Sequence, residues 1–321
     1  MNKEQISQSS NRRGFLIALI SAMVLAFTGI LIRLISEDFQ LPALVIAFWR
    51  DLFVVCCALP LLLLFKLPLL KIRLADLPFL ILFGVILAVF NVLWTLAVTL
   101  TGAAVATVLV YSSAGFTAIL GWLFLKESLE VKKILVVLLC LGGCVLVSGA
   151  VQPEAWQINS VGIVTGLLSG LLYALYSLMG RRGAQKGLNP WTILFYSFLF
   201  AAIILLGLNL LPGSHIPGTA ERPADLFLLQ SAWRGWLLLW VLAAGPTLMG
   251  FGLYNVSLSL LPSSTANLIL TLEPVLTTLL AFFLLGERLS IIEAVGSALV
   301  IAALVILRLG PSKIGTLKQF T

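Results

Sequence analysis

Long apolar runs are the feature that most constrains how this chain can fold. Ten runs of 17 to 23 residues follow one another, each bounded by charge, proline or glycine. A helix rises 1.5 Å per residue, so each run is long enough to cross the ~30 Å hydrocarbon core of a bilayer. We predict an all-α integral membrane protein with ten transmembrane helices, to within a few residues at 14–35, 43–65, 78–98, 103–125, 134–151, 162–180, 191–211, 236–258, 264–285 and 291–307.

Composition agrees with a lipid environment. The 321 residues are 60% hydrophobic and only 10% charged, whereas soluble domains carry roughly 25% charged residues. The net charge of +7 is dispersed over short loops rather than gathered on one face, which argues against a nucleic-acid partner. Cys140 and Cys144 share a helix face but have no histidine or carboxylate nearby in sequence to complete a metal site. We expect packing roles and no cofactor for all four cysteines, Cys56, Cys57, Cys140 and Cys144.

The basic residues predict the orientation. With the N-terminus in the cytoplasm, 15 Lys and Arg residues fall on the cytoplasmic side, 4 fall outside and Arg50 lies within a span. Cytoplasmic loops of membrane proteins carry an excess of Lys and Arg. We therefore place both termini in the cytoplasm and the protein in the cytoplasmic membrane.

The two halves of the sequence resemble each other. Residues 14–42 align without a gap on residues 162–190 at an offset of 148, and residues 94–130 align on 254–290 at an offset of 160. The 12-residue difference fits the long loop 212–233, which has no counterpart of equal length in the first half. Residues with a clear role at helix ends are among the identities: Gly14/Gly162, Arg33/Arg181, Pro42/Pro190 and Glu127/Glu287.

Each half holds five predicted helices, so the second half enters the membrane from the opposite side. We predict a cytoplasmic tail (1–13), a first five-helix repeat (14–151), an inverted second repeat (162–307) and a second tail (308–321). Inverted repeats recur in secondary transporters, whose substrate site lies near the bilayer midplane between the halves. One copy would hold both halves of a pathway, so a monomer suffices, with a dimer as the alternative.

Several stretches resemble a known family. Leu272-Glu273-Pro274-Val275 leads through an apolar helix to Leu285-Gly286-Glu287-Arg288-Leu289, and the first half echoes this from Gly115 to Gly143. The pattern is similar to that of the drug/metabolite transporter superfamily, in its EamA branch of ten-helix carriers. In the first half Ala114-Gly115 stands where many relatives have a proline. The resemblance implies two five-helix units around a central cavity and transport of amino acids, nucleosides, sugars or other small metabolites.

Polar groups at membrane depth are costly and are functional candidates by default. Glu273 lies near the middle of the ninth predicted span, and Pro274 interrupts the helix beside it. A buried glutamate there would bind a cationic group or carry a proton; the alternative is a structural, hydrogen-bonded glutamate. Arg50 would meet a substrate carboxylate or pair structurally with Asp51.

Aromatic and polar side chains on the third, fourth, sixth, eighth and ninth predicted spans suit a cavity for an amphipathic solute. Helix packing is the alternative. Together with Glu273 and Arg50, the predicted substrate-binding residues are Asn91, Trp94, Tyr111, Ser112, Tyr173, Tyr176, Tyr254 and Asn255. Glu127 and Glu287 end their helices, and we expect them to pair with basic neighbours such as Lys132 and Arg288.

These observations predict a secondary active or facilitated transporter that moves a small organic metabolite by alternating access. Glu273 favours a solute with an amino group and the aromatics favour an apolar body, so an amino acid or a relative is expected, in the direction of export. Import by the same fold is the alternative, and a non-transporting sensor or scaffold is a further one. We see no phosphate-binding G-x-x-x-x-G-K-[ST] loop and no catalytic constellation, so no enzyme is expected.

Overall fold

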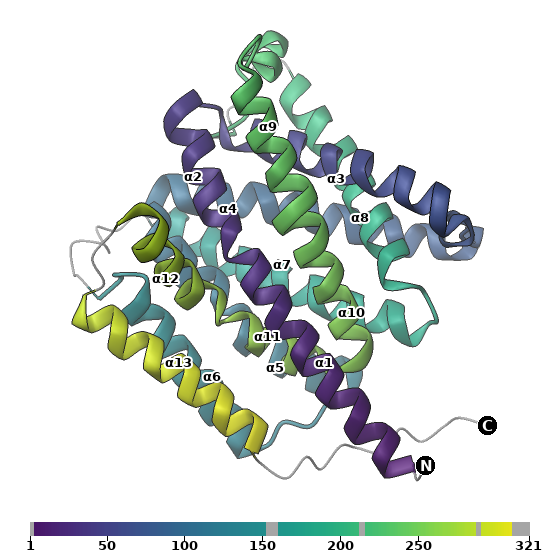
Figure 1. Cartoon of the computed structure of the whole chain (residues 1–321), viewed down its shortest axis with the longest axis vertical. Coiled ribbons are helices and arrows are strands. Elements are labelled where there is room, and N and C mark those ends of the chain that lie inside the picture. Colours follow the sequence, from purple (N-terminus) through teal and green to yellow (C-terminus); the bar gives the residue numbers. More distant parts are fainter. Residues whose placement is uncertain (1–2, 152–159, 212–215, 287–289, 310–321) are drawn as a thin grey trace.

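The structure is a computed structural model in which residues 3–151, 160–211, 216–286 and 290–309 are described. Helices make up almost all of the described chain, which contains no strand (Figure 1). The helices are α1 (Lys3–Leu25), α2 (Phe27–Phe39), α3 (Ala43–Phe65), α4 (Leu77–Tyr111), α5 (Ser113–Leu125), α6 (Val131–Val147), α7 (Ser160–Gln185), α8 (Pro190–Leu210), α9 (Trp233–Leu242), the π-helical η5 (Ala243–Phe251), α10 (Gly252–Leu260), α11 (Ser263–Leu270), α12 (Glu273–Leu285) and α13 (Ile291–Leu309).

Eight helical stretches of the described chain are long and apolar enough to cross a membrane. One of them, Leu74–Leu125, has 52 residues and is far too long for a single crossing of a ~30 Å core. Within it Gly102 has φ 78° and ψ 161°, a break that separates two of the predicted spans. The 17-residue α6 is not among the eight. The membrane-spanning helical fold is thus confirmed, while the number ten stays a prediction.

Several spans are interrupted rather than straight. A turn at Ala26 divides α1 from α2, and the stretch 233–260 passes through the π-helical segment η5. Pro246 lies in this segment and lacks the backbone N–H that an α-helix would use. The Thr247 hydroxyl donates to the Leu242 carbonyl (2.8 Å) instead. Such interruptions are tolerated in a membrane protein where neighbouring groups satisfy the freed backbone.

Helix packing places the halves of the chain against each other. α4 packs along α7, α3 along α8, α6 along α13, and α1 along η5, α10 and α11. Figure 1 shows α6 and α13 side by side at one edge and α5, α11 and α7 near the centre. The polar residues of interest lie on these central helices.

Candidate functional site

The ninth predicted span is broken beside Glu273. α11 ends at Leu270, α12 begins at Glu273, and Pro274 occupies the first turn of α12. Proline fits this position because the first amides of a helix have no internal partner. The positive end of the α12 dipole also favours a carboxylate there. The sequence therefore fixes Glu273 at the amino end of a half-helix inside the bundle.

The fourth predicted span is broken at the equivalent position without a proline. α4 ends at Tyr111 and α5 begins at Ser113, which is 160 residues before Glu273. The Ser112 hydroxyl donates to the Leu109 carbonyl (2.5 Å). A Cβ on Gly170 of α7 would lie 2.5 Å from the Ser112 Oγ and 2.8 Å from the Leu109 oxygen. The glycine thus lets α7 approach the exposed backbone of the break.

The two breaks bring Tyr111 and Glu273 together. The side chains of Tyr111 and of Tyr173 on α7 lie close to the Glu273 carboxylate. Glu273 is deep among the helices, yet its surface remains partly exposed. Tyr111 and Tyr173 keep 6% and 7% exposure. Glu273 thus combines a deep position among the helices with a partly exposed surface.

Beside this pair lies a closed network of hydroxyls and amides. The rings of Tyr176 and Tyr254 are stacked with centroids 6.4 Å apart, and both are almost completely buried. Asn255 donates to the Tyr176 hydroxyl (3.0 Å), and Tyr254 shares a 2.6 Å hydrogen bond with Ser177.

Asn267 of α11 ties this network to the fourth span. Its amide donates to Ser177 (3.1 Å) and to the Tyr254 hydroxyl (3.3 Å), and its carbonyl oxygen accepts from Ser113 (3.2 Å). The sequence analysis missed Asn267. Its only signal was an amide within an apolar span, which is the same signal that selected Asn91.

Arg50, Asp51 and Asn91 form a second closed cluster, here called the charged triad. Arg50 donates to Asp51 (3.0 Å) and to the Asn91 oxygen (3.1 Å), and the Asn91 amide donates to Asp51 (3.3 Å). Asp51 is fully buried, Asn91 is 3% exposed and Arg50 is 9% exposed. Neighbours on a helix diverge by about 100°, but the long arginine side chain curls back to its neighbour.

The structure therefore separates the predicted site residues into two sets. Glu273, Ser112 and Trp94 are half-buried. Tyr111 and Tyr173 lie close to Glu273 and keep 6% and 7% exposure. The other set bonds internally and is nearly inaccessible, which suits helix packing: Arg50, Asn91, Tyr176, Tyr254 and Asn255.

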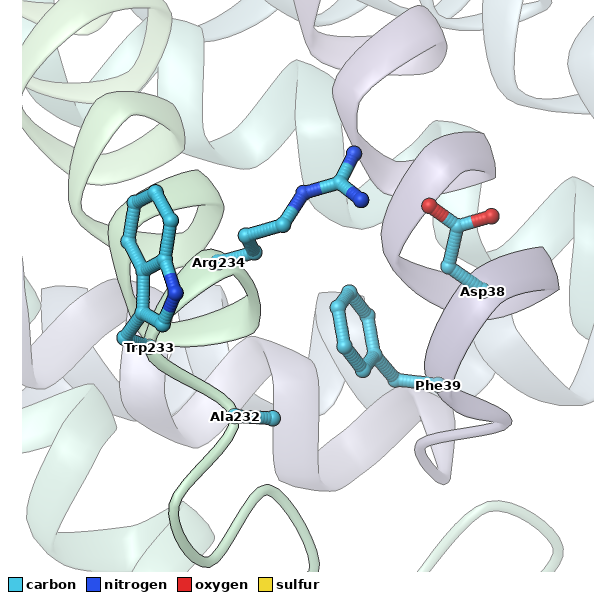
Figure 2. A pocket seen from close by; sticks show the side chains of 5 residues that line it. All are labelled: Asp38, Phe39, Ala232, Trp233 and Arg234. Atoms are coloured by element: carbon cyan, nitrogen blue, oxygen red, sulfur yellow. The ribbon is translucent and has the colours of Figure 1, made fainter.

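Two surface hollows lie elsewhere. One of about 370 Å³ lies between the end of α2 and the start of α9, lined by Asp38, Phe39, Ala232, Trp233 and Arg234. Figure 2 shows the Arg234 guanidinium pointing toward Asp38 across this hollow. The other, about 390 Å³, lies beside the end of α5. Neither hollow includes a predicted site residue, and both are open to the surface. The candidate site is therefore described by the burial and hydrogen bonds of its residues.

A comparison with protein families identifies the chain. The model of the EamA-like transporter family matches it twice, over residues 12–149 and 160–309. The chain belongs to the EamA-like transporter family. It is a multi-pass membrane protein of a transporter family, as the Glu-Pro motif of the ninth span suggested.

Relatives of this EamA-like protein carry the same general name. An uncharacterized transporter of Archaeoglobus fulgidus is 28% identical over 68% of this chain and 74% of its own length. An uncharacterized transporter of Synechocystis is 26% identical over 70% of this chain and 64% of its own length. The uncharacterized transporter YwfM of Bacillus subtilis is 27% identical over 74% of this chain and 75% of its own length. A solved crystal structure, 18% identical, has a TM-score of 0.72 and covers 92% of this chain and 97% of its own. That likeness shows the fold alone.

Proposed function

We propose that this EamA-like protein exports a small organic metabolite bearing an amino group, an amino acid or a related solute, by alternating access. The observation that carries the proposal is Glu273. It is deep in the bundle, partly accessible, and located at the amino end of a half-helix beside Tyr111 and Tyr173. A carboxylate in this position binds an ammonium group or carries a coupled proton.

The helix packing supports the inverted repeat on which alternating access depends. α4 packs on α7, and the equivalent stretch η5–α10 packs on α1, with the roles of the two halves exchanged. Gly14 lies against Leu260 and Leu261, while Gly162 lies against Leu100 and Thr101. These contacts are related by the same offsets of 148 and 160 residues as the sequence repeat. We propose repeats at 14–151 and 162–307, related by a pseudo-two-fold axis in the membrane plane.

The proposed orientation has both termini in the cytoplasm. The charge bias of 15 to 4 supports it, as does the position of the described start of α1 and end of α13 toward the same side of the molecule (Figure 1). The pathway lies within one chain, so we propose that the monomer is the transporting unit.

The test is transport of an amino-acid and metabolite panel by proteoliposomes, with and without an imposed pH gradient, comparing wild type with Glu273→Gln. The control is Glu221→Gln, which removes an exposed carboxylate. We expect a defined solute to be transported by wild type and control, and lost or uncoupled from the gradient in Glu273→Gln. Solute-loaded vesicles of known protein orientation then give the direction. Unchanged transport by Glu273→Gln would remove Glu273 from the site.

A further inference from the structure

One carboxylate joins the ends of two central helices from different halves of the chain. Glu127 follows α5, and Ser263 and Ser264 begin α11. One Glu127 oxygen accepts from the amide (2.6 Å) and the hydroxyl (2.7 Å) of Ser263. The other accepts from the amide (3.1 Å) and the hydroxyl (2.5 Å) of Ser264. A carboxylate is favoured at a helix amino end, both by the free amides and by the dipole.

The surroundings favour this arrangement. Lys133 Nζ donates to the Ser264 hydroxyl (3.0 Å) and to the Ser128 carbonyl (2.6 Å). A Cβ on Gly121 would lie 2.8 Å from a Glu127 oxygen, so glycine leaves the space into which the carboxylate folds back. We call Glu127, Lys133, Ser263 and Ser264 the latch.

The latch differs from the pairing expected from the sequence. Lys132 does not serve as the partner of Glu127, because its Nζ reaches the Leu307 carbonyl (3.4 Å). Glu287 and Arg288 lie outside the described residues. Arg181 adds a second connection at the same end, since it donates to the Leu258 and Ser259 carbonyls (3.0 and 2.9 Å) at the end of α10. A guanidinium there complements the negative end of that helix.

Among the described residues, the positions aligned with the two serines differ at the opposite end of the bundle. Ser263 and Ser264 align with Ala103 and Ala104, which carry no hydroxyl. Both serines are fully buried, whereas Ala103 is exposed.

The central half-helices show the same asymmetry. α5 packs against α11 on the latch side of the two breaks. On the other side, within the described chain, α12 makes no comparable packing with residues 103–111 of α4. Figure 1 shows α5 and α11 together near the centre and α12 apart from them. Glu273 lies at the start of α12, at the break between α11 and α12.

We propose that the latch is the gate that closes one end of the transport pathway, and that this structure is closed at the latch and open at the opposite end. The proposal rests on the proposed transport function. Release of Ser263 and Ser264 by Glu127 must precede opening at the latch, which the charge bias places on the cytoplasmic side. Because Ala103 and Ala104 offer no matching hydroxyls, closure of the other end is weaker, and the latched state is the resting state.

The test measures accessibility and needs no transported solute. In a Cys56→Ser background, which removes the exposed native thiol, one cysteine is introduced at either of two probe positions. Ala266 is fully buried on α11, one turn from the latch, and Ala103 is exposed at the open end. The rate of maleimide labelling is measured for each probe in nanodiscs, with Glu127 intact, with Glu127→Gln, and with Glu130→Gln as the control. Glu130 is an exposed carboxylate of the same loop.

Glu127→Gln is expected to raise labelling of Ala266→Cys about tenfold or more, because hydrogen bonds to a charged acceptor are lost. Labelling of Ala103→Cys is expected to fall, since the population moves to the state closed at that end. The double variant Ser263→Ala/Ser264→Ala keeps Glu127 and is expected to shift both probes in the same directions, by less. If Glu127→Gln does not fold, the labelling rates of this double variant test the gate instead.

Equal labelling of Ala266→Cys in Glu127→Gln and Glu130→Gln would overturn the gate, even if transport is intact. Faster labelling of both Ala266→Cys and Ala103→Cys would mean that the protein has lost its fold around the latch rather than opened a gate. That result would also overturn the proposal. A reciprocal shift of the two probes supports the gate even if no solute in the panel is transported, so the gate and the transport proposal fail separately.

Discussion

Glu273 and Asp51 are both carboxylates deep among the helices, but their surroundings differ in every other respect. Asp51 lies within the unbroken α3, is completely buried, and has both oxygens bound by Arg50 and Asn91. Glu273 begins a half-helix, is partly exposed, and lies close to Tyr111 and Tyr173. The comparison teaches that membrane depth alone does not mark a binding residue. Accessibility distinguishes the candidate site at Glu273 from the closed charged triad.

The largest effect is expected from Asp51→Ala, which leaves Arg50 buried without its counter-charge. Breaking a buried pair from one side costs about 3–5 kcal/mol, so we expect a large drop in apparent Tm and in the yield of monodisperse protein. Thermal unfolding in detergent measures this. The control is Glu37→Ala on the exposed pair with Arg33, where about 0.5 kcal/mol or less is expected. If Asp51→Ala were as stable as wild type, the charged triad would have no structural role, and the contrast between Asp51 and Glu273 would fail.

A somewhat smaller effect is expected from Gly170→Ala. The added Cβ would press on Ser112 and the Leu109 carbonyl, and overpacking of this kind costs about 1–3 kcal/mol. We also expect transport to fall, because displacement of α7 moves Tyr173 away from Glu273. Gly207→Ala is the matched control, since its Cβ would meet nothing within 4 Å; it should be neutral or slightly stabilising. Equal melting temperatures of the two variants would contradict the close approach at the break.

Asn267→Ala tests whether the closed hydrogen-bond network has a structural role rather than a role in transport. It removes three hydrogen bonds of the closed network, and such bonds within membranes average about 0.6 kcal/mol each. We expect a modest loss of thermal stability and transport per folded molecule that stays near wild type. A transport loss as large as that of Glu273→Gln, without loss of stability, would place Asn267 in the site itself.

Tyr111→Phe is expected to change stability least. Loss of a single hydroxyl costs about 0.5–1.5 kcal/mol. This hydroxyl lies close to the Glu273 carboxylate, and if it positions that carboxylate, transport should fall about tenfold. Tyr196→Phe is the matched control, because its hydroxyl bonds only the Leu70 carbonyl (2.7 Å). The two variants should melt alike and differ in transport rate. Similar transport by both would remove Tyr111 from the site.

Much of the fold follows from the sequence because membrane insertion is a local property of the chain. The predicted run 43–65 coincides with α3, and Glu273-Pro274 marks the break between α11 and α12. The break at Ser112 was harder to foresee. No proline marks it, and the glycine that accommodates it lies on α7, 58 residues away in the chain.

The sequence predicted most residues of the candidate site, but it did not show which of them are partly exposed and which are buried in closed hydrogen-bond networks. The sequence selected Glu273, Tyr176 and Asn91 on the same ground, that polar groups at membrane depth are costly. Only packing distinguishes the accessible glutamate from the buried tyrosine and asparagine. Asn267 carried the same signal as Asn91, but its contacts with Ser113 and Ser177, 154 and 90 residues away, appear only in the packed structure.

The sequence by itself determined the solvent, the helical class, the approximate spans and the family, because hydropathy, proline and charge act within one span or loop. The tertiary structure decided which polar groups meet: Arg50 with Asn91 across 41 residues, Glu127 with Ser263 across 136, and Ser113 with Asn267 across 154. A buried polar group accepts any partner that satisfies it. Its choice therefore depends on how the helices pack, and no local pattern encodes that.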